Sequence, residues 1–288
     1  MAKVAWLGTG MMGSGFVEAL RRRGDDVTVW NRTMERAQPL ARFGAHVADS
    51  PNEAVREVDR VHIILSDDAS VDELLARIAP DVPKNAVVVD HTTVAPKPTI
   101  ARFAWCERAG LSFLHAPVFM SPQMCRESTG IMLCSGSRET FERIEAELKT
   151  MSGELWYLGD RVDKAAATKL LGNAMLLFVV AGLADVFALA KSAGLAPDDV
   201  LELFSRFNVG GGIAFRSKRI AEANFEPSFE LVMARKDARL MLETAAAGGG
   251  HLAVLPAIAA RMDEAIAAGH GREDMSILAR ESVVKTPQ

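Results

Sequence analysis

The first 33 residues constrain the fold more than any other part of this 288-residue chain. An apolar run at residues 4–7 leads into Gly8-Thr9-Gly10-Met11-Met12-Gly13, and a helix-like run follows at residues 16–23. A second apolar run at residues 27–30 comes where the next strand of a βαβ unit is expected. A lone G-x-G-x-x-G is weak evidence, but one placed between a strand and a helix is typical of a dinucleotide site.

Each glycine of this turn has its own expected task. Gly8 allows the tight turn that leaves the strand, Gly10 lets a pyrophosphate approach the backbone, and Gly13 lets the helix pack closely on the sheet. The unpaired N–H groups and the partial positive charge at the helix start favour the pyrophosphate. The sequence therefore predicts that Gly8, Thr9, Gly10, Met11, Met12 and Gly13 bind the cofactor.

The residues after the second strand indicate which dinucleotide is bound. A cofactor with a free ribose 2′-hydroxyl usually meets Asp or Glu there, whereas this chain has Asn31, Arg32 and Thr33. Arg32 can form a forked contact with a 2′-phosphate, and Asn31 and Thr33 can donate hydrogen bonds. The alternative is a solvated arginine at a helix start with Thr33 as the N-cap. We expect NADP(H) to be preferred over NAD(H).

Composition excludes several other classes of function. The formal net charge is −4, so nothing indicates a nucleic-acid partner. The three cysteines and six histidines lack metal-ligand spacing, and an odd cysteine count argues against a disulfide scaffold, so no metal site is expected. No basic segment followed by an apolar one opens the chain. We therefore expect a soluble cytoplasmic protein.

Residues 170–184 carry no charge and raise the question of a membrane span. A spanning helix needs about 20 apolar residues, and this run is bounded by Lys169 and Asp185. The sequence instead favours a long helix buried on nearly all sides, with no membrane contact. So much apolar surface in a small helical domain needs a second subunit to cover it, which predicts a homodimer or homotetramer.

The two halves of the chain have different patterns. In the first half, strand-like and helix-like runs alternate, which predicts an α/β domain with a largely parallel sheet. In the second half, strand signals disappear and Ala, Leu and Met dominate, which predicts an all-α domain. We expect a cofactor-binding domain at residues 1–162 and a helical substrate or dimerisation domain at 163–288. Strands are expected at 4–7, 27–30, 61–65, 86–89, 111–114, 131–134 and 155–157, helices at 34–43, 71–78, 99–109 and 138–151, and helix breaks at 194–197, 210–212, 226–227 and 248–250.

Several further motifs resemble one family, the beta-hydroxyacid dehydrogenases, which includes 3-hydroxyisobutyrate dehydrogenases. The resemblance runs almost from end to end and implies an N-terminal Rossmann domain, a helical domain shared in a dimer, and hydride transfer with a nicotinamide cofactor. The matching segments are the opening glycine turn, Asp90 to Pro96 for D-x-S-T-x-x-P, Lys169-Leu170 with Asn173 for K-L-x-x-N, Lys236-Asp237 for K-D, and Gly269-His270-Gly271 with Asp274 for G-x-G-x-x-D.

The candidate catalytic pair is Lys169 and Asn173. They lie four residues apart and so share one face of the predicted helix. A lysine that faces an apolar cleft loses solvation, its pKa falls, and it can pass a proton to a carbonyl oxygen. Asn173 can hold the same oxygen. The alternative is a lysine that reaches water, with Asn173 making a local helix contact.

Other candidate cofactor contacts are less specific. Leu65 and Ser66 end the third predicted strand, and Thr93 follows the fourth, at the edge of the sheet where ligands bind. Thr93 could equally be a turn residue ahead of Pro96. By resemblance Lys236 points toward the nicotinamide, although a lysine in its KDARL segment could also be solvated.

The substrate loop departs from the family pattern. The family reads D-A-P-V-S-G-G, and this chain reads His115-Ala116-Pro117-Val118-Phe119-Met120-Ser121. We expect residues 117–121 to contact the substrate: Pro117, Val118, Phe119, Met120 and Ser121. In the family the serine and glycines hold a substrate carboxylate, and Phe119 and Met120 cannot form that small anion cradle.

The sequence therefore predicts an NADP-preferring oxidoreductase that acts on the CH–OH or C=O carbon of a small substrate. That substrate is a hydroxy acid, a semialdehyde or a related, less acidic carbonyl compound, with Lys169 as general acid and base. Two alternatives remain: imine reduction on the same scaffold, and an NADP-binding protein without catalysis. The retained Lys169 argues against the first, and the pair Lys169 and Asn173 argues against the second.

Overall fold

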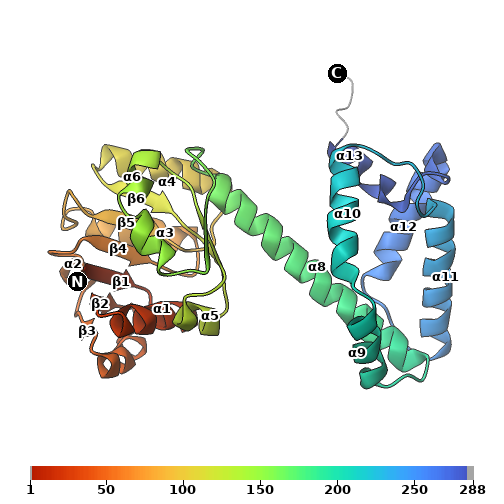
Figure 1. Ribbon diagram of the computed structural model, residues 1–288, viewed down its shortest axis with the longest axis horizontal. Helices are drawn as coiled ribbons and strands as arrows, with labels where there is room; N and C mark the ends of the chain where they lie inside the picture. The colour runs from red at the N-terminus through yellow and green to blue at the C-terminus, as the bar shows by residue number, and fades with distance from the viewer. Residues whose placement is uncertain (1, 284–288) are drawn as a thin grey trace. The chain divides into compact units, whose positions relative to one another are not determined.

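The structure is a computed structural model that describes residues 2–283. Its main sheet has six parallel strands in the order β3-β2-β1-β4-β5-β6 (Figure 1). The order reverses between β1 and β4, and in sheets of this kind ligands bind beyond the carboxyl ends of the strands at that point. The strands are β1 (Lys3–Leu7), β2 (Asp26–Trp30), β3 (His46–Val47), β4 (Arg60–Ile63), β5 (Val87–Asp90) and β6 (Ser112–His115).

Both faces of this sheet are buried, as the continuous apolar strands predict. In β1 the side chains alternate between two core clusters. Val4 and Trp6 pack with residues of α1, whereas Ala5 and Leu7 pack with residues of α3. The helices in this part are α1 (Met11–Arg22), α2 (Pro51–Ala54), α3 (Asp68–Ile78) and α4 (Pro96–Arg108).

A second, smaller sheet follows the first, and it corrects one prediction. Residues 131–134 and 155–157 do form strands, but these strands do not join the main sheet. They belong to a three-stranded sheet in the order β7-β8-β9, in which β7 and β8 are antiparallel. Its strands are β7 (Val118–Phe119), β8 (Ile131–Cys134) and β9 (Glu154–Tyr157), and its nearby helices are α5 (Pro122–Glu127), α6 (Arg138–Glu142) and α7 (Glu145–Lys149).

Two predicted helices differ in the structure. Residues 34–43 form two short 3₁₀ helices, Met34–Arg36 and Gln38–Phe43, because Pro39 removes a backbone donor within the run. Residues 138–151 form two separate helices, α6 and α7, in place of one.

The chain divides into two compact units, Met1–Ala174 and Met175–Gln288. The long helix α8 (Lys164–Ser192) begins in the first unit and ends in the second. The remaining elements of the second unit are helical, as predicted. They are α9 (Pro197–Arg206), α10 (Val209–Ala221), α11 (Leu231–Ala247), α12 (Leu255–Ala265), a π-helical turn at Ile266–His270, a 3₁₀ helix at Met275–Ala279 and α13 (Arg280–Val283).

The break predicted at residues 210–212 is wrong. All three glycines lie inside α10, and the chain breaks before them. Asn208 is the N-cap, and its side-chain oxygen accepts a hydrogen bond from the Gly210 N–H at 2.9 Å. This cap starts the helix in spite of the low helix propensity of glycine.

The predicted burial of α8 requires a second subunit, because the single chain does not cover this helix. Its apolar side chains are largely solvent-exposed, and Leu171, Leu177 and Phe178 are each about 70% exposed. The helix is long and apolar enough to cross a membrane by length and composition, with a mean hydropathy of 2.0 over 18 residues. Asp185 nevertheless anchors its second half within the second unit, since this carboxylate accepts the N–H groups of Ala253, Val254 and Leu255 at 2.7–2.9 Å.

Candidate functional site

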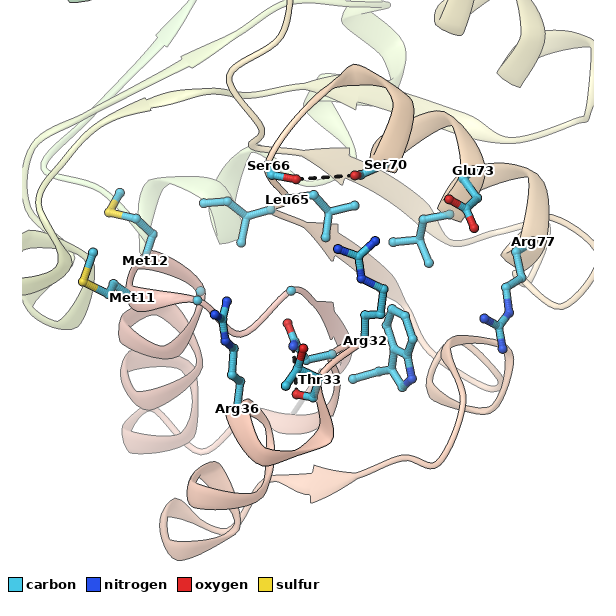
Figure 2. Close-up of a pocket in the computed structure, with 17 residues that line it drawn as sticks. Met11, Met12, Arg32, Thr33, Arg36, Leu65, Ser66, Ser70, Glu73 and Arg77 are labelled. Carbon is cyan, nitrogen blue, oxygen red and sulfur yellow. Dashed lines mark hydrogen bonds between the residues drawn. The ribbon is translucent and has the colours of Figure 1, made fainter.

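A cavity of about 420 Å³ lies beyond the carboxyl ends of β1, β2 and β4 (Figure 2). It is the place where the reversal of strand order predicts a ligand. Ten of the predicted cofactor residues line this cavity, and seven residues that were not predicted line it as well. The lining residues are Gly8, Gly10, Met11, Met12, Gly13, Trp30, Asn31, Arg32, Thr33, Arg36, Ile64, Leu65, Ser66, Ser70, Glu73, Leu74 and Arg77.

The glycine turn has the geometry that its three expected tasks require. Gly8 has φ +103°, and a Cβ there would lie 2.0 Å from the Ile64 carbonyl oxygen. A Cβ on Gly13 would lie 2.0 Å from the Gly8 oxygen, so glycine permits the close contact of turn and helix. A Cβ on Gly10 would meet nothing within 4 Å. Gly10 therefore leaves an open approach to the backbone where α1 begins, which suits a pyrophosphate.

Asn31 joins the end of β2 to the glycine turn. Its side-chain oxygen accepts the Thr9 N–H at 3.0 Å, and its amide nitrogen donates to the Thr33 oxygen at 2.9 Å. Both ends of the amide are thus used within the protein. Thr9 itself is buried and does not line the cavity. Asn31 shapes the wall of the cavity and fixes the backbone that carries Arg32.

Two exposed arginines lie at the cavity beside Thr33. Arg32 follows β2, and Arg36 lies on the first 3₁₀ helix (Figure 2). Among residues 2–283 neither has an ion-pair partner. Arg36 was not among the predicted residues, although it stands three residues after Thr33, the spacing that brings helical residues to one side. Free guanidinium groups suit a phosphate, because they can donate forked hydrogen bonds to it.

A third arginine, Arg77 of α3, lies across the cavity near Glu73 (Figure 2). Its guanidinium lies 5.8 Å from the ring centroid of Trp30 and also donates to Asn52. Arg77 is therefore held by neighbouring side chains, in contrast to Arg32 and Arg36.

The other predicted cofactor residues lie in different places. The Leu65 N–H is held by the Thr92 hydroxyl at 3.0 Å, and Ser66 donates to Asp67 at 2.7 Å. Thr93 is exposed on the loop after β5 and does not line the cavity. Lys236 is exposed on α11 in the second unit, where it pairs with Asp237 at 2.9 Å.

Beneath the cavity, the main sheet buries a stack of rings that includes two histidines. Trp6 stacks on His62 and on His91, with ring centroids 5.1 and 5.6 Å apart. His91 donates from Nδ1 to the Ala116 oxygen at 2.7 Å, and its Nε2 therefore accepts from His62 Nδ1 at 2.9 Å. Burial lowers the pKa of His91 to about 4 and that of His62 well below its usual value. Both rings are neutral at pH 7 and serve as core residues.

The predicted catalytic pair meets near the start of α8. Lys169 Nζ donates to Asn173 Oδ1 at 2.9 Å, as four-residue spacing on a helix allows. Only 9% of Lys169 is exposed, and burial lowers the pKa of its ammonium. Because Oδ1 accepts this bond, the Asn173 Nδ2 group keeps its donors for another oxygen. The pair can offer protons to one small polar group.

The predicted substrate loop is part buried and part accessible. Pro117 and Val118 are buried, and Val118 belongs to the main core. Phe119 and Met120 are half-buried, and Ser121 is exposed. Ser121 is the N-cap of α5, and its hydroxyl accepts the Met124 N–H at 3.2 Å. The Ser121 hydroxyl hydrogen stays free to donate elsewhere.

Two protein families match the chain, one for each part of it. Residues 3–159 match the NAD-binding domain of 6-phosphogluconate dehydrogenase, and residues 164–282 match the family described as NAD-binding of NADP-dependent 3-hydroxyisobutyrate dehydrogenase. The first match alone covers more than half of the chain. It also includes the whole cavity.

Individual relatives are similar at a lower level. The Drosophila melanogaster protein named cytokine-like nuclear factor N-PAC is 28% identical over 83% of this chain, but the chain spans only 40% of that protein. Glyoxylate/succinic semialdehyde reductase 2 of Arabidopsis thaliana is 28% identical over 83% of this chain and 68% of its own length. The structure of an imine reductase from Myxococcus stipitatus in complex with NADP+ has a TM-score of 0.90 at 24% identity, over 96% of this chain and 99% of that one.

These matches agree with the motifs read from the sequence and with the cavity. The family resemblance and the predicted fold class, an α/β Rossmann domain followed by a helical region, are thereby confirmed. The cavity residues fit the cofactor of that family, because a glycine cradle and free arginines face the same space. The chain belongs to the beta-hydroxyacid dehydrogenase family and carries its NAD(P)-binding domain.

Proposed function

We propose that the protein is an NADP(H)-preferring oxidoreductase that acts on the CH–OH or C=O carbon of a small hydroxy acid, semialdehyde or less acidic carbonyl compound. The buried pair of Lys169 and Asn173 carries this proposal. When bound, the nicotinamide accepts or supplies a hydride. Lys169 then gives a proton to the substrate oxygen during reduction and removes it during oxidation.

The lowered pKa of Lys169 supports this role. A general acid or base works best when its pKa lies near the working pH, and burial moves the ammonium in that direction. Asn173 supports it in a second way, because its free N–H donors can hold the same substrate oxygen while its Oδ1 holds the lysine.

The preference for NADP(H) rests on Arg32 and Arg36. These two guanidinium groups lie beside Thr33 at the end of β2, where an NAD-specific protein would carry a carboxylate. Neither guanidinium has an ion-pair partner within residues 2–283, and two such forked donors favour the 2′-phosphate over a hydroxyl.

Lys169→Ala tests the proposed chemistry, and Lys164→Ala is its matched control. Lys164 is on the same helix but exposed. NADPH oxidation at 340 nm is followed against aldehydes, keto acids and cyclic imines. Lys169→Ala should lower kcat by about 10² to 10⁴ without weakening NADPH binding, whereas Lys164→Ala should leave both unchanged. Full activity of Lys169→Ala would remove Lys169 from the role.

The same substrate panel separates the two alternatives. The solved imine reductase shares this fold, and imine reduction is therefore the second candidate activity. Among the relatives, N-PAC is named as a nuclear factor and not as an enzyme, which makes a protein without turnover the other alternative. Imines as the preferred substrates would support the first, and NADPH binding without oxidation by any compound would support the second.

We further propose a cytoplasmic homodimer or homotetramer that contacts no membrane and no nucleic acid. The exposed apolar side chains of α8 support self-association, because soluble monomers rarely expose so large an apolar surface. The charge of Asp185 and its backbone contacts argue against a membrane span. Light scattering of the detergent-free protein tests the proposal, and a monomer would contradict it.

A further inference from the structure

A phenylalanine covers one side of the Lys169 ammonium. Phe119 ends β7, whose pairing with β8 places Phe119 opposite Ile131. Successive strand residues point to opposite faces, so Val118 enters the main core while Phe119 packs in a separate cluster with Ala165 of α8. The backbone of the small sheet thus fixes the direction in which the Phe119 ring points.

The Lys169 ammonium has two contacts that hold it in place. Nζ lies 4.3 Å from the centroid of the Phe119 ring and 2.9 Å from Asn173 Oδ1. The face of an aromatic ring carries partial negative charge and attracts a cation. The ring therefore both shields the ammonium from water and favours its position beside Asn173.

The ring reaches this place because residue 172 is glycine. A Cβ on Gly172 would lie 2.3 Å from Cζ of Phe119 and 2.4 Å from Cε1. These distances are far below van der Waals contact, so any other residue would push the ring away. Gly172 lies inside α8, where glycine is disfavoured relative to alanine, and it marks a close approach. Phe119 and Gly172 form a knob and a hole directly beside Lys169.

We infer that Phe119, seated on Gly172, positions Lys169. We also infer that Phe119 makes the site selective for uncharged carbonyl substrates over carbonyl substrates whose carbon chain carries a carboxylate. This inference rests on the proposed reductase function and specifies its substrate class. By the resemblance drawn from the sequence motifs, Phe119 takes the position of a serine in the family pattern. It is a positioning and specificity-determining residue.

The chemistry of the ring explains the selectivity. A phenylalanine side chain donates no hydrogen bond, so a carboxylate placed against it would lose water and gain no partner from the ring. The partial negative charge on the ring face repels an anion as well. An ester, an alkyl chain or a second ring loses little hydration on the same surface and gains contact area.

The test compares 4-oxobutanoate with its methyl ester, which differ by one charge. Wild type should reduce the ester with the higher kcat/KM. In Phe119→Ser the ratio of ester to acid should fall about tenfold or more, mainly through KM for the acid, because the hydroxyl donates to the carboxylate. In Phe119→Leu the ratio should stay near that of wild type, because leucine also lacks a donor. Phe103→Leu loses a ring elsewhere in the first unit and is the control.

Labelling of Lys169 by acetic anhydride provides a readout that does not depend on turnover. Labelling is carried out at about pH 11, where lysine amines are largely neutral in every variant, so that the rate reports access to the amine. Peptide mass spectrometry should then show Lys169 labelled several-fold faster in Phe119→Ser and in Gly172→Ala than in wild type, because both variants remove the shield. Lys164 should react equally in all of them. Gly172→Ala leaves Phe119 intact, so it tests the contact even where Phe119→Ser does not fold.

The outcomes separate the inference from the proposed function. An unchanged ester-to-acid ratio in Phe119→Ser, or a wild type that prefers the acid, would overturn the selectivity. Equal labelling of Lys169 in wild type and Gly172→Ala would overturn the positioning. A wild type that reduces no compound of either class would overturn the proposed function and the selectivity together, while the labelling would still decide the positioning.

Discussion

The cofactor cavity and the Lys169 site lie in the same unit but recognise chemistry in contrasting ways. The cavity presents exposed charges and an open backbone, with Arg32 and Arg36 free and Gly10 uncovered. The Lys169 site is enclosed, with one cation held between an amide and an aromatic face. The contrast teaches that exposed backbone and arginine side chains suffice to bind a cofactor that a whole family shares. Selectivity for a substrate depends instead on the side chain that covers the Lys169 ammonium.

Replacing both Arg32 and Arg36 should produce the largest effect of all, on the choice between NADPH and NADH in the cofactor cavity. Each charge-assisted contact with a phosphate contributes about 1.5–3 kcal/mol, or about 10- to 100-fold in affinity. Arg32→Ala with Arg36→Ala should therefore lower the NADPH-to-NADH ratio of kcat/KM by roughly 10³. Steady-state kinetics with both cofactors measure the ratio. Arg42→Ala is the control because Arg42 does not line the cavity, and an unchanged ratio in the double variant would refute the preference.

Acidic pH should lower the free energy of unfolding, because the main sheet buries three neutral histidines. His91 and His115 have folded pKa values of about 4, below their ordinary 6.5, and the pKa of His62 is also lowered. The unfolded chain therefore binds more protons, and stability is lost as pH falls from 6.5 toward 4. Asp90, whose pKa burial raises to about 6, opposes this by binding a proton in the folded state.

Three histidines outweigh one carboxyl, so the net loss between pH 7 and pH 5 should be on the order of 3 kcal/mol. Urea unfolding followed by tryptophan fluorescence at the two pH values measures it. His251→Asn should leave the pH dependence unchanged, since His251 is exposed. Equal stability at pH 5 and pH 7 would contradict the role of the buried rings.

Gly10→Ala should have the smallest effect on the free energy of unfolding and should still weaken NADPH binding. An added Cβ meets no protein atom, so the free energy of unfolding should change by less than about 0.5 kcal/mol. The same Cβ lies where the pyrophosphate approaches, and the Kd for NADPH should rise about tenfold. Gly13→Ala should instead lower stability, because its Cβ would clash with the Gly8 oxygen. Chemical denaturation and fluorescence titration separate the two effects, and unaltered NADPH affinity in Gly10→Ala would exclude the close approach.

The sequence predicted the cavity well because its key residues are close together in the chain. The glycine turn and residues 31–33 each act through local backbone geometry, which spacing alone can reveal. Arg36 was not predicted because it lies beyond residues 31–33 at the strand end, on the 3₁₀ helix that follows them. Thr9, predicted to touch the cofactor, is buried, and its N–H is held by Asn31.

The contact of Phe119 with Gly172 could not be predicted from local patterns. The two residues are far apart in the sequence, and their contact depends on how β7 pairs with β8 and how α8 passes over the small sheet. The exposure of α8 was also missed. Periodicity showed an apolar helix, but it cannot show whether the covering surface comes from the same chain.

The knob and hole at Phe119 and Gly172 also restrict the order in which these residues could have been acquired. A helix with alanine at 172 accepts serine at 119 but not the Phe119 ring in its present position, because the added Cβ would lie 2.3 Å from the ring. A helix with glycine at 172 accepts either residue. The stepwise route to this site therefore runs through glycine first, at a small loss of helix stability, and phenylalanine second. Reversion follows the same rule: laboratory evolution that starts from this chain should keep the ring seated beside Lys169 only while residue 172 stays glycine.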